Sequence, residues 1–365
     1  MSAAERPELV LLAVQSSAIV DHVALVERAA ILREAGEEAG SQRVSHAELE
    51  RLLSGRPFTS SAGGSAANTL RGLASGFGLR CGVVGAVGDD AFGELYCAAL
   101  ANAGVDTARL VLQPGRPTGR CAVLVDPEGQ RTMRTALDGA ACLQEGNIAA
   151  DCFSGCAWVS LSLYALYTPG LAGAVVGCAR LNGCHLALHL GSWELVRRFR
   201  GELRALLTSG CVRAVFCNER EAREFAADEA TGEPGCAEDA LEELTRLCGT
   251  AVVTLGPRGC VARCGAQTVR QEAVARVECV DSTAAGDLFA AGFLAGLTQS
   301  APLDMCAKLG CLAGAAAVTV PGADVSPAAW KWAKAQLSLL GLPQSQTPAS
   351  QSDSCPGWLP ADTPD

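Results

Sequence analysis

A run of small residues in the last third of the sequence ends at a single acid, and an apolar segment follows it directly. Residues 281–287 have the sequence DSTAAGD, and residues 288–293 continue as LFAAGF. This pattern is typical of a helix N-terminus whose free N–H groups can receive an anion, because no bulky side chain blocks its approach. Asp287 could there accept a proton from a hydroxyl group. The helix dipole alone also favours an acid in a first turn, so a purely structural role stays open.

A second glycine-rich segment lies in the first third of the chain. Residues 63–68 have the sequence GGSAAN and lead into a helical pattern. Gly63 and Gly64 would let the backbone come close to a ligand, since glycine has no side chain in the way. Asn68 can both donate and accept hydrogen bonds, which suits the binding of a polyol. An ordinary turn before a helix can have the same residues, so this segment is not decisive alone.

Together and in this order, the two segments resemble the signatures of the ribokinase-like (PfkB) kinase family. Residues 63–93 resemble the first signature, and residues 281–287 resemble the second, D-T-x-G-A-G-D. Between them, NERE at 218–221 is similar to the family's N-x-x-E, and TLGPRG at 254–259 is similar to its T-x-G-x-x-G nucleotide segment. The resemblance extends over residues 9–330, and the stretches 129–133 and 287–297 are closest to the adenosine-kinase-like branch.

The resemblance implies a phosphotransferase that moves the γ-phosphate of ATP to a hydroxyl group of a sugar or a nucleoside. Asp287 would be the general base. Charge on the transferring phosphoryl group would be stabilised by the backbone N–H groups of Ala284, Ala285, Gly286 and Asp287. In the substrate site, hydroxyl groups would be held by Asp21, Gly63, Gly64 and Asn68. Arg131 would either reach the substrate from a lid or remain a solvated lid arginine.

The same resemblance implies how the nucleotide and its metal are held. Asn218 and Glu221 would position Mg²⁺ through water, which suits an ion that keeps much of its hydration. The residues that would pass close to the nucleotide are Thr254, Gly256 and Gly259. Gly322 lies in the segment that, in many members of the family, shapes the adenine site or a site for a monovalent cation such as K⁺.

Two positions depart from the family pattern. Ala284 stands where glycine is usual, and Ser282 stands where threonine is usual. Alanine is strained there if the position needs a left-handed backbone conformation and unstrained otherwise. The alternative function is therefore a catalytically weakened PfkB-like scaffold that acts by binding other proteins. An active kinase is favoured by the joint presence of Asp287, Asn218, Glu221 and Asn68, for which a scaffold has no chemical need.

Other kinase and nucleotide-binding chemistries are excluded by what the sequence lacks. Lysine occurs only at positions 308, 331 and 334, and the missing G-K-[ST] motif excludes a P-loop. The V-A-I-K and H-R-D motifs of protein kinases are missing as well. A Rossmann dehydrogenase would carry G-x-G-x-x-G after its first strand, and residues 9–17 contain no glycine.

The elements that must position these residues alternate between strand and helix. Strands that are apolar on both faces predict an α/β fold, a central and mostly parallel sheet flanked by helices on both faces. The expected strands cover residues 9–14, 80–87, 157–163, 185–190, 214–217 and 251–255, and helical patterns include 66–77 and 238–247.

A further part of the chain does not follow this alternation. Residues 122–125 and 131–135 predict a hairpin around the turn DPEG, and the stretch 26–53 is charged and helix-prone. The family resemblance implies a small β-lid built from parts of residues 14–60 and 112–137.

Composition limits the partners and the domains of the chain. It has 365 residues, of which 49% are hydrophobic, and a net charge of −10, which argues against a nucleic-acid binder. Residues 151–180 include a long uncharged stretch, but Pro169 and Gly170 interrupt it. It therefore predicts a strand, a loop and a packed helix, and no membrane span. Residues 1–342 are expected to form the kinase domain, and 343–365 a Pro- and Ser-rich disordered tail.

The cysteines indicate the compartment. The sequence has 18 cysteines and 4 scattered histidines, without any C-x-x-C pair. Most cysteines lie in apolar runs, which predicts small buried side chains and argues against a zinc site or a disulfide framework. Free thiols favour a reducing compartment, and the N-terminus resembles no signal peptide, so we expect the cytoplasm and leave an organelle open.

Substrate identity and assembly stay open at this stage. A nucleoside needs an apolar slot for its base, which could be lined by Trp158, Leu163, Tyr164 and Tyr167, although such residues also pack in cores. Fructose or ribose is the alternative substrate. Both a monomer and a homodimer are compatible with the sequence.

Overall fold

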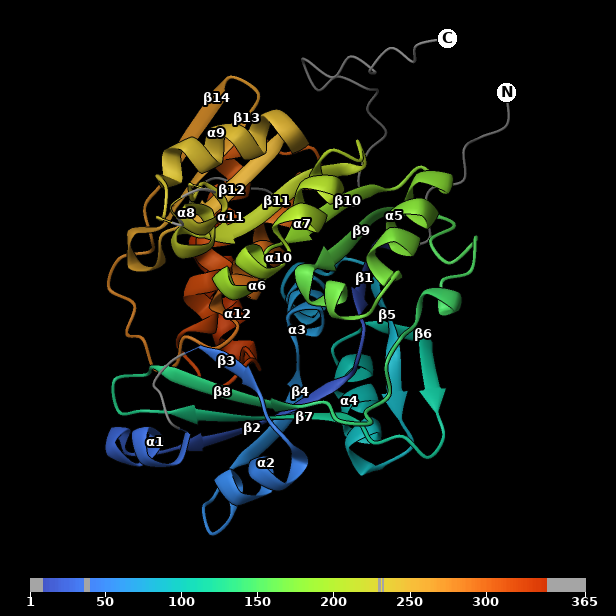
Figure 1. Ribbon diagram of the computed structural model, residues 1–365. Coiled ribbons are helices and arrows are strands. Elements are labelled where there is room, and N and C mark those ends of the chain that lie inside the picture. Colours follow the sequence, from blue (N-terminus) through green and yellow to red (C-terminus); the bar gives the residue numbers. More distant parts are fainter. Residues whose placement is uncertain (1–8, 36–39, 229–230, 232, 340–365) are drawn as a thin grey trace.

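The computed structural model describes residues 9–35, 40–228, 231 and 233–339. This described part has two β-sheets, one with nine strands and one with five. In Figure 1 the smaller sheet, blue and teal, lies below the larger one. The expected tail, residues 343–365, lies outside the described residues.

The large sheet has the strand order β14-β13-β12-β11-β10-β9-β1-β5-β6. Its strands are β1 (Leu9–Gln15), β5 (Cys81–Gly88), β6 (Asp106–Gln113), β9 (Cys156–Ser162), β10 (His185–His189), β11 (Val212–Asn218), β12 (Thr250–Thr254), β13 (Cys260–Cys264) and β14 (Gln267–Gln271). All neighbours are parallel except β12–β13 and β13–β14, so the expected mostly parallel sheet is confirmed. The antiparallel edge was not predicted, because β14 is half-exposed and has no apolar run.

Alternation along β1 separates two hydrophobic cores. Leu12 and Val14 face one core, which includes side chains of α5 (Leu171–Leu181), α7 (Arg200–Leu207) and α9 (Ala237–Cys248). Leu11 and Ala13 face the other. That second core is built with α3 (Ser65–Arg71), α4 (Ala91–Asn102), α10 (Ala285–Leu297) and α11 (Leu303–Ala317). Helices thus cover both faces of the sheet, as the apolar strands predict.

The smaller sheet is the β-lid, with the strand order β3-β8-β7-β2-β4. Its strands are β2 (Ile19–Leu25), β3 (Ser41–Arg43), β4 (Thr59–Gly63), β7 (Gly119–Val125) and β8 (Arg131–Ala136). One of its faces is covered by α1 (Arg28–Ala35) and α2 (His46–Leu53), whose Ile31 and Leu49 pack against Ala24 and Leu124. This explains why the stretch 26–53 stands outside the alternation of the main sheet.

The uncharged stretch 151–180 folds as β9, the short turn of 3₁₀-helix η3 (Leu163–Tyr167) and most of α5. Among the helices described, none has both the length and the apolar character that a membrane crossing would need. The described cysteines are free thiols. Burial raises the pKa of Cys81 and of Cys156 to about 12, so these thiols stay protonated and pack as small apolar groups.

Candidate active site

The start of α10 is an open helix N-terminus, built as the small residues before it suggest. Gly286 is exposed, and a side chain added there would meet no atom within 4 Å. The preceding loop is fixed by Asp281, which is buried. One of its carboxylate oxygens accepts from the N–H and the Oγ1 of Thr283 at 2.8 and 2.7 Å, and the other accepts from the N–H of Gly322 at 2.7 Å. The contacts of Asp281 therefore fix the loop before α10, while the exposed Gly286 leaves the helix N-terminus open to an anion.

Asp287, in the first turn of α10, is held by side chains from α3. Ser65 Oγ donates to its Oδ1 at 2.6 Å, and Asn68 Nδ2 donates to its Oδ2 at 2.9 Å. Burial raises the pKa of Asp287, while these two hydrogen bonds and the charge of Arg131 act to lower it. The carboxylate is thus fixed in orientation and made more basic than a solvated one, as a general base requires.

Close packing of α3 and α10 brings these residues together from distant parts of the chain. After α3 the helix continues as one π-helical turn, Gly72–Gly76, where the sequence predicted a single regular helix. A Cβ atom at Gly72 would lie 2.6 Å from Leu288 Cδ1 and 2.8 Å from Ala291 Cβ. Only glycine lets the two helices come this near, and the approach places Ser65 and Asn68 beside Asp287.

The diglycine segment makes room for two polar side chains. A Cβ atom at Gly63 would lie 2.2 Å from Cγ of Asp21, and one at Gly64 would lie 2.5 Å from Nε2 of Gln15. Gln15 Nε2 donates to the carbonyls of Ser17 and Gly63 at 3.1 and 3.2 Å, and its Oε1 accepts from Ala67 N at 3.0 Å. Sequence reasoning missed Gln15, since a single glutamine at a strand end has no recognisable spacing.

Asp21 stands on β2 of the lid with an unused acceptor. Its side chain is 4% exposed, and its Oδ1 has no hydrogen-bond partner among the described residues. Burial raises its pKa to about 7, although the charges of Arg71 and Arg131 lower it; the charge of Asp287 raises it further. A buried carboxylate with a free oxygen is suited to accept hydrogen bonds from the hydroxyl groups of a ligand.

Arg131 and Tyr164 face the same charged region. The charge of Arg131, at the start of β8, acts on the pKa of Asp21, Asp287 and Tyr164. Burial raises the pKa of Tyr164 to about 12, and the charges of Glu221 and Asp287 add to this. Of the four residues that could line a base slot, Tyr164 is the most exposed, at 37%, and the charges of Asp287 and Glu221 act on its pKa.

The other three candidates for a base slot lie elsewhere. Trp158 is buried in one core and meets His185 edge to face, and Leu163 is buried in the other core. The guanidinium groups of Arg43 and Arg198 lie over the ring of Tyr167, at 4.0 and 5.1 Å from its centroid. Arg43 belongs to the lid strand β3, so Tyr167 contacts the lid.

Asn218 and Glu221 form a reciprocal cap at the start of α8 (Glu219–Phe225). Asn218 Oδ1 accepts from Glu221 N at 2.9 Å, while Glu221 accepts from Asn218 N at 3.0 Å and from Asn218 Nδ2 at 2.7 Å. Glu221 is buried, and this burial raises its pKa to about 7. The cap therefore holds one carboxylate at the carboxyl end of β11, where ligands bind in open α/β sheets.

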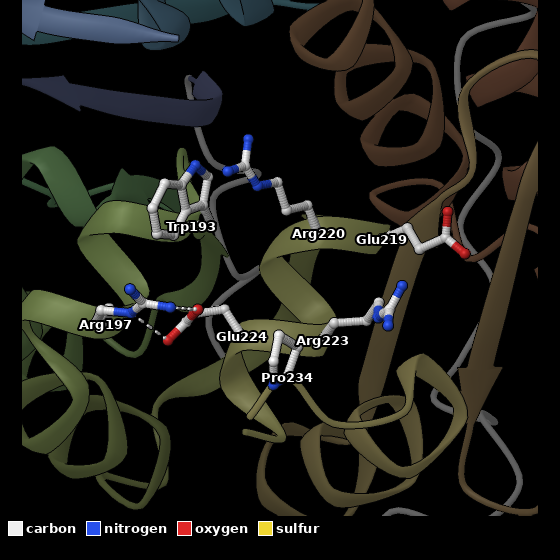
Figure 2. A pocket seen from close by; sticks show the side chains of 7 residues that line it. All are labelled: Trp193, Arg197, Glu219, Arg220, Arg223, Glu224 and Pro234. Carbon is white, nitrogen blue, oxygen red and sulfur yellow. Dashed lines mark hydrogen bonds and ion pairs between the residues drawn. The ribbon is translucent and has the colours of Figure 1, made fainter. Parts of the chain in front are cut away.

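A pocket of about 440 Å³ lies over α8 and α6 (Trp193–Arg198), next to this cap. Figure 2 shows the Arg220 side chain extending from α8 toward the Trp193 ring. Arg220 and Arg197 stack on the Trp193 ring at 4.2 and 4.9 Å, and Arg197 also binds both oxygens of Glu224. These contacts fix α8 against α6 and so fix the direction of Glu221.

The nucleotide segment follows β12 and depends on two glycines. Thr254 ends the strand, and Gly256 has a φ of +58° with open space around it. Gly259 has a φ of +86°, and a Cβ there would lie 2.0 Å from the carbonyl oxygen of Gln271. An ion pair between Arg258 and Glu219 joins this segment to α8. Gly322 has a φ of +73°, and its N–H donates to Asp281. It therefore contacts the loop 281–284 before α10, which we call the anion loop.

Comparison with known proteins gives this geometry its context. A family model described as pfkB family carbohydrate kinase matches residues 41–330. The chain belongs to this family. All four segments that resemble the family's motifs, from Gly63 to Asp287, lie within the matched residues of this pfkB kinase.

Relatives of this pfkB kinase act on different acceptors. The solved structure of an adenosine kinase from Sinorhizobium meliloti is 32% identical, covers 90% of this chain and 99% of its own, and has a TM-score of 0.81. A fructokinase of Escherichia coli is 29% identical over 280 residues, which are 72% of this chain and 87% of the fructokinase. A putative ribokinase II of Escherichia coli, solved with ATP and Mg²⁺, shares the fold at 18% identity and a TM-score of 0.72, covering 91% of this chain and 99% of its own. This protein is thus a carbohydrate or nucleoside kinase of the pfkB family.

Ala284 adopts the left-handed conformation that alanine disfavours. Its φ and ψ are 59° and 5°, and its methyl group is buried against Leu288 and Ala317. The conformation costs about 1–2 kcal/mol. Burial of the methyl group offsets about 0.8 kcal/mol, and glycine would itself cost about 0.5–1 kcal/mol in chain entropy. These opposing terms nearly cancel, so alanine is tolerated in the anion loop.

We expect Ala284→Gly to change the free energy of unfolding by less than about 1 kcal/mol and to preserve turnover. Ser300→Gly is the matched control, because Ser300 has a φ of 56° but is exposed and buries no methyl group. It should stabilise the protein by about 0.5–1 kcal/mol. Urea unfolding measures both values, and a gain in turnover of more than tenfold for Ala284→Gly would show that the strain impairs catalysis.

Proposed function

We propose that this pfkB kinase transfers the γ-phosphoryl group of ATP to a hydroxyl group of an adenosine-like nucleoside, with Asp287 as the general base. The observation that carries the proposal is the double hydrogen bond from Ser65 and Asn68 to Asp287 at the open start of α10. A carboxylate that only started a helix would gain nothing from two donors on another helix. It would also not share its surroundings with Asp21 and Arg131.

The chemistry follows from this placement. The substrate hydroxyl donates its proton to Asp287 while its oxygen attacks the γ-phosphorus atom and the bond to the ADP oxygen breaks. The N–H groups of Ala284, Gly286 and Asp287 stabilise charge on the transferred group, where losing one donor commonly costs ~10²–10³ in rate. The N–H of Ala285, expected to take part as well, donates to the Ser282 carbonyl at 3.3 Å. Asp21 and Asn68 hold the other hydroxyl groups between lid and sheet, and Gly63 leaves the room that the Asp21 side chain needs.

A nucleoside is favoured over a free sugar by Tyr164. Its side chain is 37% exposed, and the charges of Asp287 and Glu221 act on its pKa, so a flat aromatic surface is open to stack on a base. The similarity to an adenosine kinase at 32% identity supports the same choice. Fructose or ribose is the second candidate, supported by the similar fructokinase.

Turnover of purified protein with Mg-ATP on adenosine, inosine, ribose and fructose tests the proposal. We expect adenosine to have the highest kcat/KM, and Tyr164→Ala to lower it for nucleosides more than for sugars. If only fructose or ribose is phosphorylated, the acceptor is a sugar and the nucleoside proposal is wrong. The scaffold alternative, raised by Ala284, predicts no turnover and no nucleotide binding on this panel.

For the metal, the residues present fit Mg²⁺ held mainly by the nucleotide. Among the described residues no group of three or more His, Cys, Asp or Glu could hold a metal ion alone. Glu221 is one buried carboxylate whose direction is set by Asn218, which suits contact through water to a hydrated ion. Bound Mg²⁺ would neutralise charge on the β- and γ-phosphates.

Glu221→Gln should raise the Mg²⁺ concentration needed for half-maximal rate by about tenfold, because a charged acceptor for the hydrated ion is lost. Glu238→Gln, an exposed acid in the first turn of α9, is the matched control and should leave this concentration unchanged. The readout is the initial rate at fixed ATP over a Mg²⁺ titration. An equal response of both variants would contradict a metal role for Glu221.

A monovalent cation, K⁺, is also part of the proposal. Asp281 is buried, and its hydrogen-bond donors among the described residues are all neutral groups of Thr283 and Gly322. A cation near this loop would offset the buried charge. Replacing K⁺ by choline at constant ionic strength should then lower kcat, and an unchanged kcat would remove K⁺ from the proposal.

We propose a monomer in the cytoplasm, with residues 1–342 as one kinase domain. The lid face that could pair with a second lid is covered by α1 and α2 of the same chain, which leaves less apolar surface for a partner. Sedimentation equilibrium should give the mass of one chain, and a dimer mass would contradict the assignment. Buried thiols of high pKa, such as Cys81, fit a reducing compartment, which fractionation of cells would test.

A further inference from the structure

Arg71 ends α3 with its side chain almost wholly inside the protein, at 6% exposure. One Nη atom donates to the Ala62 carbonyl and to Asn68 Oδ1, both at 2.8 Å, and the other forms an ion pair with Asp324. Buried arginines are rare because desolvation of the charge is costly, so such a residue calls for a reason beyond packing.

The contact with Asn68 determines which way its amide points. Arginine has donors only, so the atom that faces Arg71 must be the amide oxygen of Asn68. The amide nitrogen is then directed away from Arg71, and it donates to Asp287 Oδ2 at 2.9 Å. With the amide reversed, the oxygen of Asn68 would face the carboxylate and repel it.

The charge of Arg71 also reaches two carboxylates of the site. It lowers the pKa of Asp21 and of Asp287, and each of these acids in turn acts on Arg71. Asp21 and Asp287 repel one another, as the effect of Asp287 on the pKa of Asp21 shows. A cation near both acids lowers the cost of ionising them together.

We propose that Arg71 is a positioning residue, which holds the Asn68 amide with its nitrogen toward Asp287 and places a buried positive charge near the Asp21 and Asp287 carboxylates. The inference rests on the proposed function of Asp287 as a base. It also connects Asp324, which follows α11, to Asp287 at the start of α10, through the contacts of Arg71 and Asn68.

The test is the dependence of kcat on pH for Arg71→Met and Arg71→Lys. The groups that face Asp287 are Ser65, Asn68 and Arg71 of α3, Arg131 and Asp21 of the lid, Tyr164 of η3 and Glu221 of α8. In Arg71→Met a cation is lost, the pKa of Asp287 rises, and the acidic limb should move up by about one pH unit. At pH 7 kcat should fall about 10–100-fold and partly recover at pH 9, with KM for ATP unchanged.

Arg71→Lys separates charge from orientation. One ammonium group keeps the charge but cannot hold Asn68, Ala62 and Asp324 together, so kcat should fall about tenfold while the acidic limb stays in place. Arg263→Met, on β13 next to the edge strand β14, is the control and should leave kcat and its pH profile unchanged. If Arg71→Met does not fold, the kcat of Arg71→Lys alone tests the role of Arg71.

The outcomes are distinct for the two proposals. Unchanged kcat in Arg71→Lys, or an unmoved limb in a folded Arg71→Met, overturns the role of Arg71 alone. A wild-type protein without turnover on any sugar or nucleoside overturns the proposed function, and the role of Arg71 with it.

Discussion

Asp287→Asn is expected to lower kcat by about 10²–10⁴-fold, the share that a general base commonly supplies. The amide that replaces the carboxylate can keep both contacts with α3, because its oxygen can accept from Asn68 Nδ2 and its nitrogen can donate to Ser65 Oγ. The fold and the affinity for ATP should therefore be preserved. Single-turnover kinetics and calorimetric titration with an ATP analogue measure the two effects.

Asp304→Asn is a suitable control for this experiment. Asp304 is likewise an acid in a first turn, that of α11, where it pairs with Lys308. If Asp287 were only a helix-start carboxylate, the two variants would both retain turnover. Loss of ATP affinity in Asp287→Asn would contradict its assignment as a base, because a base for the acceptor hydroxyl is not needed to bind the nucleotide.

Asp21→Asn is expected to lower kcat/KM for the phosphate acceptor by about 10–100-fold, because hydrogen bonds to a charged group contribute about 1.5–3 kcal/mol. Asp21 has a buried oxygen without a partner among the described residues. KM for ATP should stay within about twofold. Steady-state kinetics with each substrate varied in turn would separate the two, and an equal loss for ATP would remove Asp21 from the acceptor site.

The same variant should be more stable than the wild type, and more so at pH 8 than at pH 5. The pKa of Asp21 is raised from 3.8 to about 7 in the folded protein, mainly by burial. The folded state therefore holds its proton longer than the unfolded state, and this stabilisation is lost as pH rises from about 4 to about 7. In Asp21→Asn this group no longer titrates, so the loss of stability with rising pH is removed. Thermal unfolding of both proteins at the two pH values measures it, and an equal difference at pH 5 and pH 8 would contradict a raised pKa.

Asp21 and Asp287 differ in whether their hydrogen-bond donors are present before a ligand binds. A carboxylate with a free, buried acceptor lowers stability until a ligand supplies the donor. Asp287 has its donors already, from Ser65 and Asn68, and its orientation does not depend on a ligand. This difference matches a residue that binds substrate and a residue that must be in place before substrate arrives.

The sequence alone determined the family, the sheet with helices on both faces and the helix start at residues 281–287. These features are local or periodic. An open helix start needs small residues next to one another, as in 281–287, and a buried strand needs a continuous apolar run, as in 9–14. Such patterns are complete within a few residues, so they can be recognised without knowing what lies beside them.

Only the tertiary structure decided which polar side chains meet. Gln15 and Arg71 are single residues without a characteristic spacing. Ser65 and Asp281 lie in the two recognisable segments, but the sequence does not show which groups they contact. Gly72 looks like an ordinary glycine inside the predicted helix 66–77 until α10 is seen packed against it. The backbone of Ala284 was likewise undecided, because its left-handed conformation is imposed by the contacts of Asp281 and α10 around it. Contacts between distant elements depend on packing, and packing is a property of the whole fold.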